Sequence, residues 1–536
     1  MTTLAGAGAL ARMAIRRDRI MLPIWLYAFA AFIGATVYGF RGLYPTAAGR
    51  AEFAATANHN SALLSIYGPF YGSSIGSFTA WRDTAICALL AGLMSVFIVV
   101  RHTRADEEAG RGELIGSAAV GRHAALAGAL MVAVAANLAA GVVLAVVAIV
   151  LGLPAAGSIA LAAGIAACGL VFAAAAAVTA QLARAARTAR GLAVAALGVV
   201  FLLRAVGDSV GVGGPRWLSW LSPIGWAELI RPFGPAGGPR WWVLVLPAVL
   251  AALAAVLAGL LAARRDYDAG IWAQRAGPAT AARWLGTPLA LAWRLQRATA
   301  ASWLAGALVY GVVLGSASHG IQGLFGTTQV RRIVLEMGGA HGLTDAFLAA
   351  VMSMTGLAVG GYAISAVLRL RSEEAGARAD VALAAGAGRL GWALSHLVIA
   401  TAGVLAILGM TGLGVAAGLG TGAGTAGGAG TAQMLGAALA QAPAALVLGG
   451  LTAALFGLAP RAATTGAWSV LGFTAAVLFL GPTLRLPSWL LDVSPFTHAP
   501  RLPGGGVSAA PLLWLGLAAV ALACLGLFGV RRRDIG

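Results

Sequence analysis

Apolar runs of about 20 residues recur along the whole chain, separated by short polar segments that carry most of the charge. Wound as an α-helix, a run of that length crosses the hydrocarbon core of a bilayer, which is about 30 Å thick. Alternating segments of roughly ten residues, typical of transmembrane β-barrels, do not occur. The pattern therefore predicts an all-α polytopic membrane protein with about twelve transmembrane helices. The predicted spans are 20–40, 84–100, 124–151, 156–180, 191–206, 241–263, 300–318, 346–368, 391–418, 433–458, 465–481 and 511–530.

Positive charge is distributed unevenly between the two sides of the predicted spans. With the N-terminus inside, 25 of the 36 basic residues fall in cytoplasmic segments, which is the bias that orients membrane proteins. We predict a multi-pass protein of the inner (plasma) membrane with both termini cytoplasmic. The net charge of +18 would suggest nucleic acid as a partner of a soluble protein. Because the topological bias explains this charge, we expect contact with membrane lipid and no nucleic-acid partner.

The chemistry that the chain can carry is limited by what it lacks. All 36 basic residues are arginine, and without lysine there is no Walker A loop for ATP and no amine for Schiff-base catalysis. Cys87, Cys168 and Cys524 lie within apolar runs, which predicts small core residues. The seven histidines show no metal-ligand spacing. We expect no catalytic residue, no metal site and no cofactor bound by this chain, and predict that it is not an enzyme.

Landmarks in the first half of the chain return in the second half at a nearly constant offset. The first segment, RMAIRRDRIMLPIW (12–25), is matched by LAWRLQRATAASW (291–303). The other pairs are EEAG at 107–110 and 373–376, GR at 121–122 and 388–389, Ser-Pro at 222–223 and 494–495, and ARRD at 263–266 with RRRD at 531–534. We predict a fused tandem duplication with halves 1–268 and 269–536. Six spans in each half return the chain to the same side, so the halves are predicted to be parallel repeats.

Seven of the 18 acidic residues lie in two short loops that are predicted to be cytoplasmic. The loops read RADEEAGRGELIGSAAVGR (104–122) and RLRSEEAGARADVALAAGAGR (369–389). Glu107 and Arg111 have the i, i+4 spacing of a helical ion pair, and the start of a helix stabilises acidic residues. A solvated loop is the alternative, but acidic residues contribute little to membrane topology. We therefore predict that each half projects a short acidic helix, which docks onto a partner with two-fold symmetry.

Two further kinds of segment flank the predicted spans. Arginine pairs three residues apart precede a tryptophan by six residues, and they indicate either topological anchoring or an interfacial helix. The pairs are Arg16 with Arg19 and Arg294 with Arg297. Because the spacing is repeated, we favour the interfacial helix. The Trp- and Pro-rich segments 214–235 and 484–503 indicate either an aromatic belt or an external cap of short re-entrant helices.

With these motifs, the chain resembles the permease subunit of type-2 ABC exporters over essentially its whole length. It looks like the actinobacterial permeases that export polyketide antibiotics and other drugs. In that family the loop between the second and third spans forms a coupling helix, which sits in a groove of the ATP-binding subunit. The resemblance assigns ATPase coupling to Glu107, Glu108, Gly110, Arg111 and Glu113 in the first loop, and to Glu373, Glu374, Gly376 and Arg378 in the second.

The second loop departs from the family pattern in two ways. Ala377 separates Gly376 from Arg378, and Asp380 corresponds only loosely to Glu113. We therefore expect an asymmetric pair of docking sites. Segments 10–19 and 289–298 match the family's interfacial connecting helix, and the Trp- and Pro-rich segments match its external helices.

The resemblance implies a permease that exports hydrophobic or amphiphilic compounds such as antibiotics and drugs. It also implies a separate ATPase, present in two copies, that binds ATP and Mg²⁺, and the missing Walker A loop agrees with this. The alternative is a proton-coupled secondary drug transporter, which needs buried ionisable groups, and acids are rare in the predicted spans. Candidates for a substrate path between the halves, or else for core packing, are Met94, Phe97, Met352 and Met354.

Overall fold

The fold was obtained as a computed structural model. It describes residues 3–116, 120–209, 217–234, 238–266, 269–272, 280, 282–318, 343–420, 427–484, 487–506 and 508–533. Every regular element among these residues is a helix. The chain forms two compact units, Met1–Ala276 and Gly277–Gly536.

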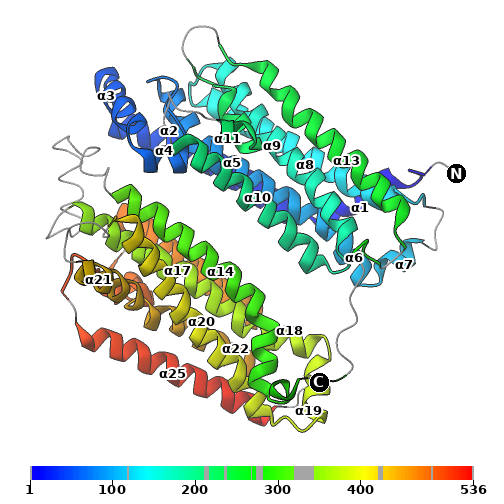
Figure 1. The fold of residues 1–536 in the computed structure, drawn as a ribbon, viewed down its shortest axis with the longest axis vertical. Helices are drawn as coiled ribbons and strands as arrows, with labels where there is room; N and C mark the ends of the chain where they lie inside the picture. The colour runs from blue at the N-terminus through cyan, green and yellow to red at the C-terminus, as the bar shows by residue number, and fades with distance from the viewer. Residues whose placement is uncertain are drawn as a thin grey trace. The chain divides into compact units, whose positions relative to one another are not determined.

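The first unit is built from long apolar helices joined by short polar ones. Its helices are α1 (Ala7–Arg17), α2 (Met21–Leu43), α3 (Ala47–Asn58), α4 (Ser61–Tyr67), α5 (Ile75–Arg101), α6 (Arg104–Glu108), α7 (Arg111–Gly116), α8 (Ala124–Val150), α9 (Ala155–Leu182), α10 (Ala186–Ser209), α11 (Trp217–Trp220), α12 (Pro223–Leu229), the 3₁₀ helix η1 (Trp241–Leu244) and α13 (Val245–Arg264). Within this unit α6 and α7 lie at the same end as the N-terminus, and α3 lies at the opposite end (Figure 1).

The second unit repeats this plan. Its helices are η2 (Arg283–Gly286), α14 (Pro288–Ser318), α17 (Leu343–Val367), α18 (Arg369–Ala375), α19 (Arg378–Ala384), α20 (Arg389–Gly418), α21 (Gly427–Leu439), α22 (Ala442–Leu458), α23 (Ala463–Leu484), α24 (Ser488–Leu491), η3 (Pro495–Thr497) and α25 (Ala509–Arg532). Here α18 and α19 lie at the end that holds the C-terminus, and α21 lies at the other end (Figure 1).

Eleven helical segments in the described part of the chain are long and apolar enough to cross a membrane. The predicted span at 465–481 falls on α23, whose described apolar part, Ala463–Leu478, is shorter. The predicted fold class, an all-α polytopic membrane protein, is confirmed. The predicted span at 433–458 is interrupted between α21 and α22, because Pro443 in the first turn of α22 has no N–H to donate and its ring blocks continuation of the preceding helix.

Small residues bring the central helices of the first unit together. α5 packs along α9, and Ala88 and Ala91 of α5 and Ala176 of α9 are among their buried positions. Small side chains allow helix backbones in a membrane to approach closely. Cys87 and Cys168 lie in this core, as predicted. The same prediction for Cys524 is wrong, since that thiol is exposed on α25, which buries only one face.

Both Trp- and Pro-rich segments form short helices. The first contains α11 and α12, and Ser222 caps α12 by accepting a hydrogen bond from the Gly225 amide at 3.3 Å. The second contains α24 and η3. Residues 214–216, 235 and 485–486 of these segments lie outside the described residues. Helices this short cannot span a bilayer. The prediction of a cap requires short helices of this kind.

Candidate functional site

The first acidic loop consists of two short helices at one end of its unit. α6 follows α5 almost directly, and α7 begins after a turn at Ala109 and Gly110. Gly110 has a φ of 69°, a left-handed conformation that glycine adopts without steric cost. This turn ends α6, so residues before and after it do not share one helical face.

The carboxylates of Asp106 and Glu107 form ion pairs with arginines of the same unit. Arg17 at the end of α1 contacts Asp106 at 2.9 Å, and Arg111 contacts it at 2.7 Å. Glu107 is paired with Arg104 at 2.7 Å and with Arg265, which directly follows α13. The Arg104 side chain is fully buried. This network therefore joins the loop to the first and last long elements of the unit.

The predicted ion pair between Glu107 and Arg111 is wrong. Both residues are paired, but Arg111 contacts Asp106, and Glu107 contacts Arg104 and Arg265. The physical reason is the turn at Gly110, which ends α6 before an i, i+4 contact can form.

The remaining acids of the first loop are exposed. The Glu108 carboxylate accepts a hydrogen bond from the Ala186 amide at 2.7 Å, and it thereby caps the start of α10 from a distant part of the chain. Glu113 lies in the first turn of α7, and among the described residues its side chain has no ion-pair partner.

Behind the loop is a cavity of about 470 Å³, lined by residues that include Met13, Asp106 and Arg265. Ion pairs more than close packing hold the loop in place.

The segment predicted to be an interfacial helix in the first unit forms α1, but its predicted arginines do not make its main contacts. Arg16 and Arg19 are exposed, and Arg19 lies beyond the end of the helix. The contacts come from Arg17 and from Asp18, which sequence reasoning missed. Asp18 is fully buried and contacts Arg101 at 2.7 Å and His102 at 2.6 Å. The adjacent opposite charges at the helix end were the signal that could have identified it.

The second acidic loop, formed by α18 and α19, repeats these pairs. Glu373 contacts Arg369 and Arg378, each at 2.9 Å. Glu374 accepts two hydrogen bonds from Arg533, at 2.9 and 2.8 Å. Arg533 directly follows α25, as Arg265 follows α13, so each loop is joined to the last long helix of its own unit.

These contacts correct the register in which the two loops match. The EEAG motifs align Glu107 with Glu373, an offset of 266 residues, whereas equivalent contacts align Glu107 with Glu374, an offset of 267. In the structural register Asp380 matches Glu113. Gly121–Arg122 and Gly388–Arg389 share this offset too, since Arg122 and Arg389 donate to the carbonyls of Arg265 and Arg533 at 3.2 and 3.0 Å.

The same register explains the unmatched alanine of the second loop. Ala377 occupies the position of Gly110 and has a φ of 53°, while Gly376 has a φ of −95°. A left-handed alanine is strained by about 1–2 kcal/mol. The alignment of the two EEAG motifs, at an offset of 266 residues, concealed this substitution because it placed Gly376 opposite Gly110.

The segment predicted to be interfacial in the second unit is built differently. It is the start of α14, which continues without a break into the membrane, and Arg294 and Arg297 are exposed on it. Gln296 stands two residues after Arg294, as Asp18 stands two after Arg16. The Gln296 amide is buried and lies 3.0 Å from Nδ1 of His396 on α20. A neutral hydrogen bond thus replaces the ion pairs of Asp18.

Comparison with known proteins identifies the chain. Residues 285–531 match the family described as the C-terminal domain of the multidrug efflux system permease Rv1217c. The chain is 42% identical, over 533 residues, to the multidrug efflux system permease protein Rv1217c of Mycobacterium tuberculosis, with 99% of this chain and 95% of the relative covered. The chain belongs to this family of multidrug efflux permeases.

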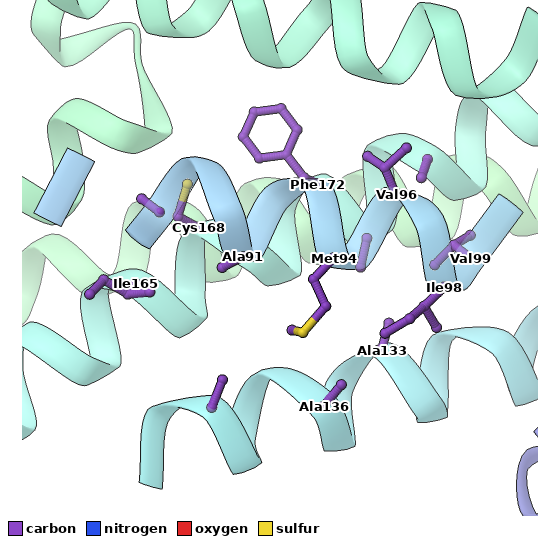
Figure 2. Close-up of a cluster of buried hydrophobic side chains, with 14 of the residues drawn as sticks. Ala91, Met94, Val96, Ile98, Val99, Ala133, Ala136, Ile165, Cys168 and Phe172 are labelled. Carbon is purple, nitrogen blue, oxygen red and sulfur yellow. The ribbon is translucent and has the colours of Figure 1, made fainter. Parts of the chain in front are cut away.

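Two of the four candidate path residues of this permease are fully buried, and a third is partly buried beside an arginine. Met94 is fully buried, and Figure 2 shows it between α5 and the Ala133 and Ala136 side chains of α8. Met352 is likewise fully buried. The ring of Phe97 lies 5.5 Å from the guanidinium carbon of Arg190. The fourth, Met354, is 41% exposed and lines a cavity of the second unit.

Proposed function

We propose that this permease is the membrane subunit of an ATP-driven exporter, and that its two acidic loops couple it to a separate ATP-binding subunit. The observation that carries the proposal is the repeated ion-pair network. Arg265 connects the first loop, and Arg533 the second, to the last helix of the same unit. A push on either loop is therefore passed directly to a membrane helix.

The exposed residues of the loops are the candidates for docking. In the first loop these are Glu108, Gly110, Arg111 and Glu113, and in the second they are Gly376, Arg378 and Asp380. Glu107, Glu373 and Glu374 are turned inward and hold the loops in shape. Coupling thus uses two layers of charge, one facing the partner and one facing the permease.

Two loops require two docking surfaces, so the partner is proposed to act as a pair of ATP-binding subunits that hold ATP and Mg²⁺ between them. Closing of that pair would move both loops. The cargo is proposed to be hydrophobic or amphiphilic drugs, in keeping with the name of the M. tuberculosis relative. The loops and both termini would then be cytoplasmic and the protein would lie in the inner membrane.

A proton-coupled carrier is supported less well. The first unit buries ionisable groups between α10 and α12, where Arg204 contacts Glu228 at 2.8 Å. Asp83 accepts a hydrogen bond from Thr36 at 2.8 Å. Carboxylates held by such fixed donors are suited to joining helices, whereas a proton relay needs groups that change partners in a water-filled cavity.

The test is reversal of the exposed charges, Glu113→Arg combined with Asp380→Arg. Because both side chains are exposed, the variant should remain a monodisperse membrane protein. We expect it to lose co-purification with a co-expressed candidate ATP-binding subunit, for example one encoded beside the permease gene, and to lose drug export from cells.

The matched control reverses exposed acids elsewhere, Glu52→Arg on α3 and Asp492→Arg after α24. It has the same change in charge and should keep the partner. Retention of the ATP-binding subunit by the Glu113/Asp380 variant would overturn the proposal.

A further inference from the structure

The second unit contains a cavity of about 380 Å³ among α14, α17 and α20. Its walls include Trp303, Ala307 and Tyr310 of α14, Met354 and Thr355 of α17, and Thr411 of α20. Small-molecule sites in proteins have volumes of about 300–1,000 Å³ and mostly apolar walls with a few polar groups. Size and lining therefore match a site for one compound.

The lining also restricts which compounds fit. No charged side chain is among the described residues that line the cavity. The Thr355 hydroxyl donates to the Val351 carbonyl of its own helix at 2.8 Å and is also in hydrogen-bond contact with the Tyr310 side chain. Thr411 is fully buried and donates to the Ile407 carbonyl at 3.0 Å, so the accessible polar group of the wall is the hydroxyl pair of Tyr310 and Thr355. Trp303 packs edge-on against Tyr362, with ring centroids 5.7 Å apart, which fixes an aromatic wall.

The matching place in the first unit is occupied by a large side chain. Trp25 and Trp303 occupy matching positions, so Phe29 corresponds to Ala307. Phe29 is fully buried in the core of the first unit, in the same cluster as Ala88. Exchange of a phenyl ring for a methyl group at this position accounts for space in the second unit.

Close glycine contacts keep this space open. Gly311 and Gly315 of α14 lie against Gly414 and Gly418 of α20, and a Cβ added at Gly315 would lie 2.2 Å from the Val415 carbonyl oxygen. This small-residue crossing draws α14 onto α20 and leaves α17 at a greater distance. At the positions that match Gly311 and Gly315, the first unit has Ile33 and Val37.

We propose that this cavity binds uncharged aromatic compounds carried by the permease, with preference for those that can exchange a hydrogen bond with the Tyr310 and Thr355 hydroxyls. The proposal rests on the proposed export function for its physiological meaning. Binding itself does not depend on the ATP-binding subunit, so it is tested on the purified permease alone.

The binding test uses a thiol at the cavity wall. In a Cys524→Ala background, which removes the exposed native thiol, Met354→Cys is labelled with a small membrane-permeable maleimide. Nile red, an uncharged planar aromatic dye, should slow this labelling severalfold. The control is Leu308→Cys on α14, which is 40% exposed and lies outside the cavity lining, and which the dye should not protect.

A second pair of variants fills the cavity. Ala307→Phe, or Ala307→Leu if the larger ring prevents folding, should abolish protection of Met354→Cys, whereas Leu308→Phe should leave it intact. Equal protection at both thiols, or protection that survives filling, would overturn the proposal. The proposal would also be overturned if the dye failed to protect Met354→Cys and native mass spectrometry showed that Ala307→Phe loses a bound phospholipid, because the cavity would then be a lipid site. Because Ala307→Phe leaves both acidic loops unchanged, it should retain the ATP-binding subunit, and this separates failure of the cavity from failure of coupling.

Discussion

The two acidic loops share one pattern of ion pairs but are attached to their units to different extents. In the first loop Asp106 is held by Arg17 of α1, and Asp18 adds contacts to the end of α5. In the second loop the described partners of Glu373 are arginines of the loop itself. The shared pairs, to Arg265 and Arg533, are those needed to connect a loop to a membrane helix. The additional pairs attach the first loop to the separate helix α1, which has no counterpart in the second unit because α14 is continuous.

The largest difference between the loops is expected when their shared carboxylates are removed. Glu107→Ala takes the carboxylate from the fully buried Arg104 and from Arg265. Breaking a buried ion pair costs about 3–5 kcal/mol. Glu374→Ala affects Arg533, whose side chain is 17% exposed and can be hydrated, so its cost should be about half as large. Thermal unfolding of the purified permease, followed by tryptophan fluorescence, measures both, and equal losses would contradict the stronger attachment of the first loop.

A smaller and more local effect is expected at α1 and at the start of α14. Asp18→Asn removes the charge that faces Arg101 and His102 in a buried site, and hydrogen bonds to charged groups contribute about 1.5–3 kcal/mol. Hydrogen exchange of residues 7–17 should accelerate by roughly tenfold or more.

The matched change in the second unit is Gln296→Leu, which removes the hydrogen bond to His396. Exchange in α14 should change little, because the backbone hydrogen bonds of that helix continue into the membrane. Acceleration of the same size in both segments would show that the continuous helix gives no advantage.

How far the sequence predicted these features depends on the range of the interactions involved. Apolar runs identified the long helices, because burial in a bilayer is decided residue by residue along one segment. Acidic residues are rare in the chain, so their concentration in two short segments identified both loops. The partners of those acids were not predictable in this way, since Arg17 and Arg265 are brought to Asp106 and Glu107 by tertiary packing. Local spacing instead suggested Arg111 as the partner of Glu107, an expectation that the turn at Gly110 overrides.

The cavity illustrates the same limit. The sequence marked Met354 as one of four candidates, and nothing in its neighbourhood distinguished it from Met94 or Met352. The distinction arises from Ala307 and from the glycine contacts of α14 with α20. These residues lie on other helices, so the space becomes visible only when the two units are compared.

The smallest expected effect concerns the turn at the centre of each loop. Gly110 and Ala377 both adopt the left-handed conformation, with φ of 69° and 53°. Gly110→Ala should destabilise the first loop by about 1 kcal/mol, because an added Cβ is strained there.

Ala377→Gly should stabilise the second loop, by less than 1 kcal/mol, since the greater freedom of glycine in the unfolded chain offsets part of the relief. Gly388→Ala is the control, because a φ of −68° suits alanine and an added Cβ would meet no atom within 4 Å. Hydrogen exchange of residues 104–116 and 369–384 measures the changes. If Ala377→Gly slows exchange and strengthens binding of a candidate ATP-binding subunit, strain at this one residue weakens docking of the second loop; slower exchange with unchanged binding would show that this strain does not affect docking.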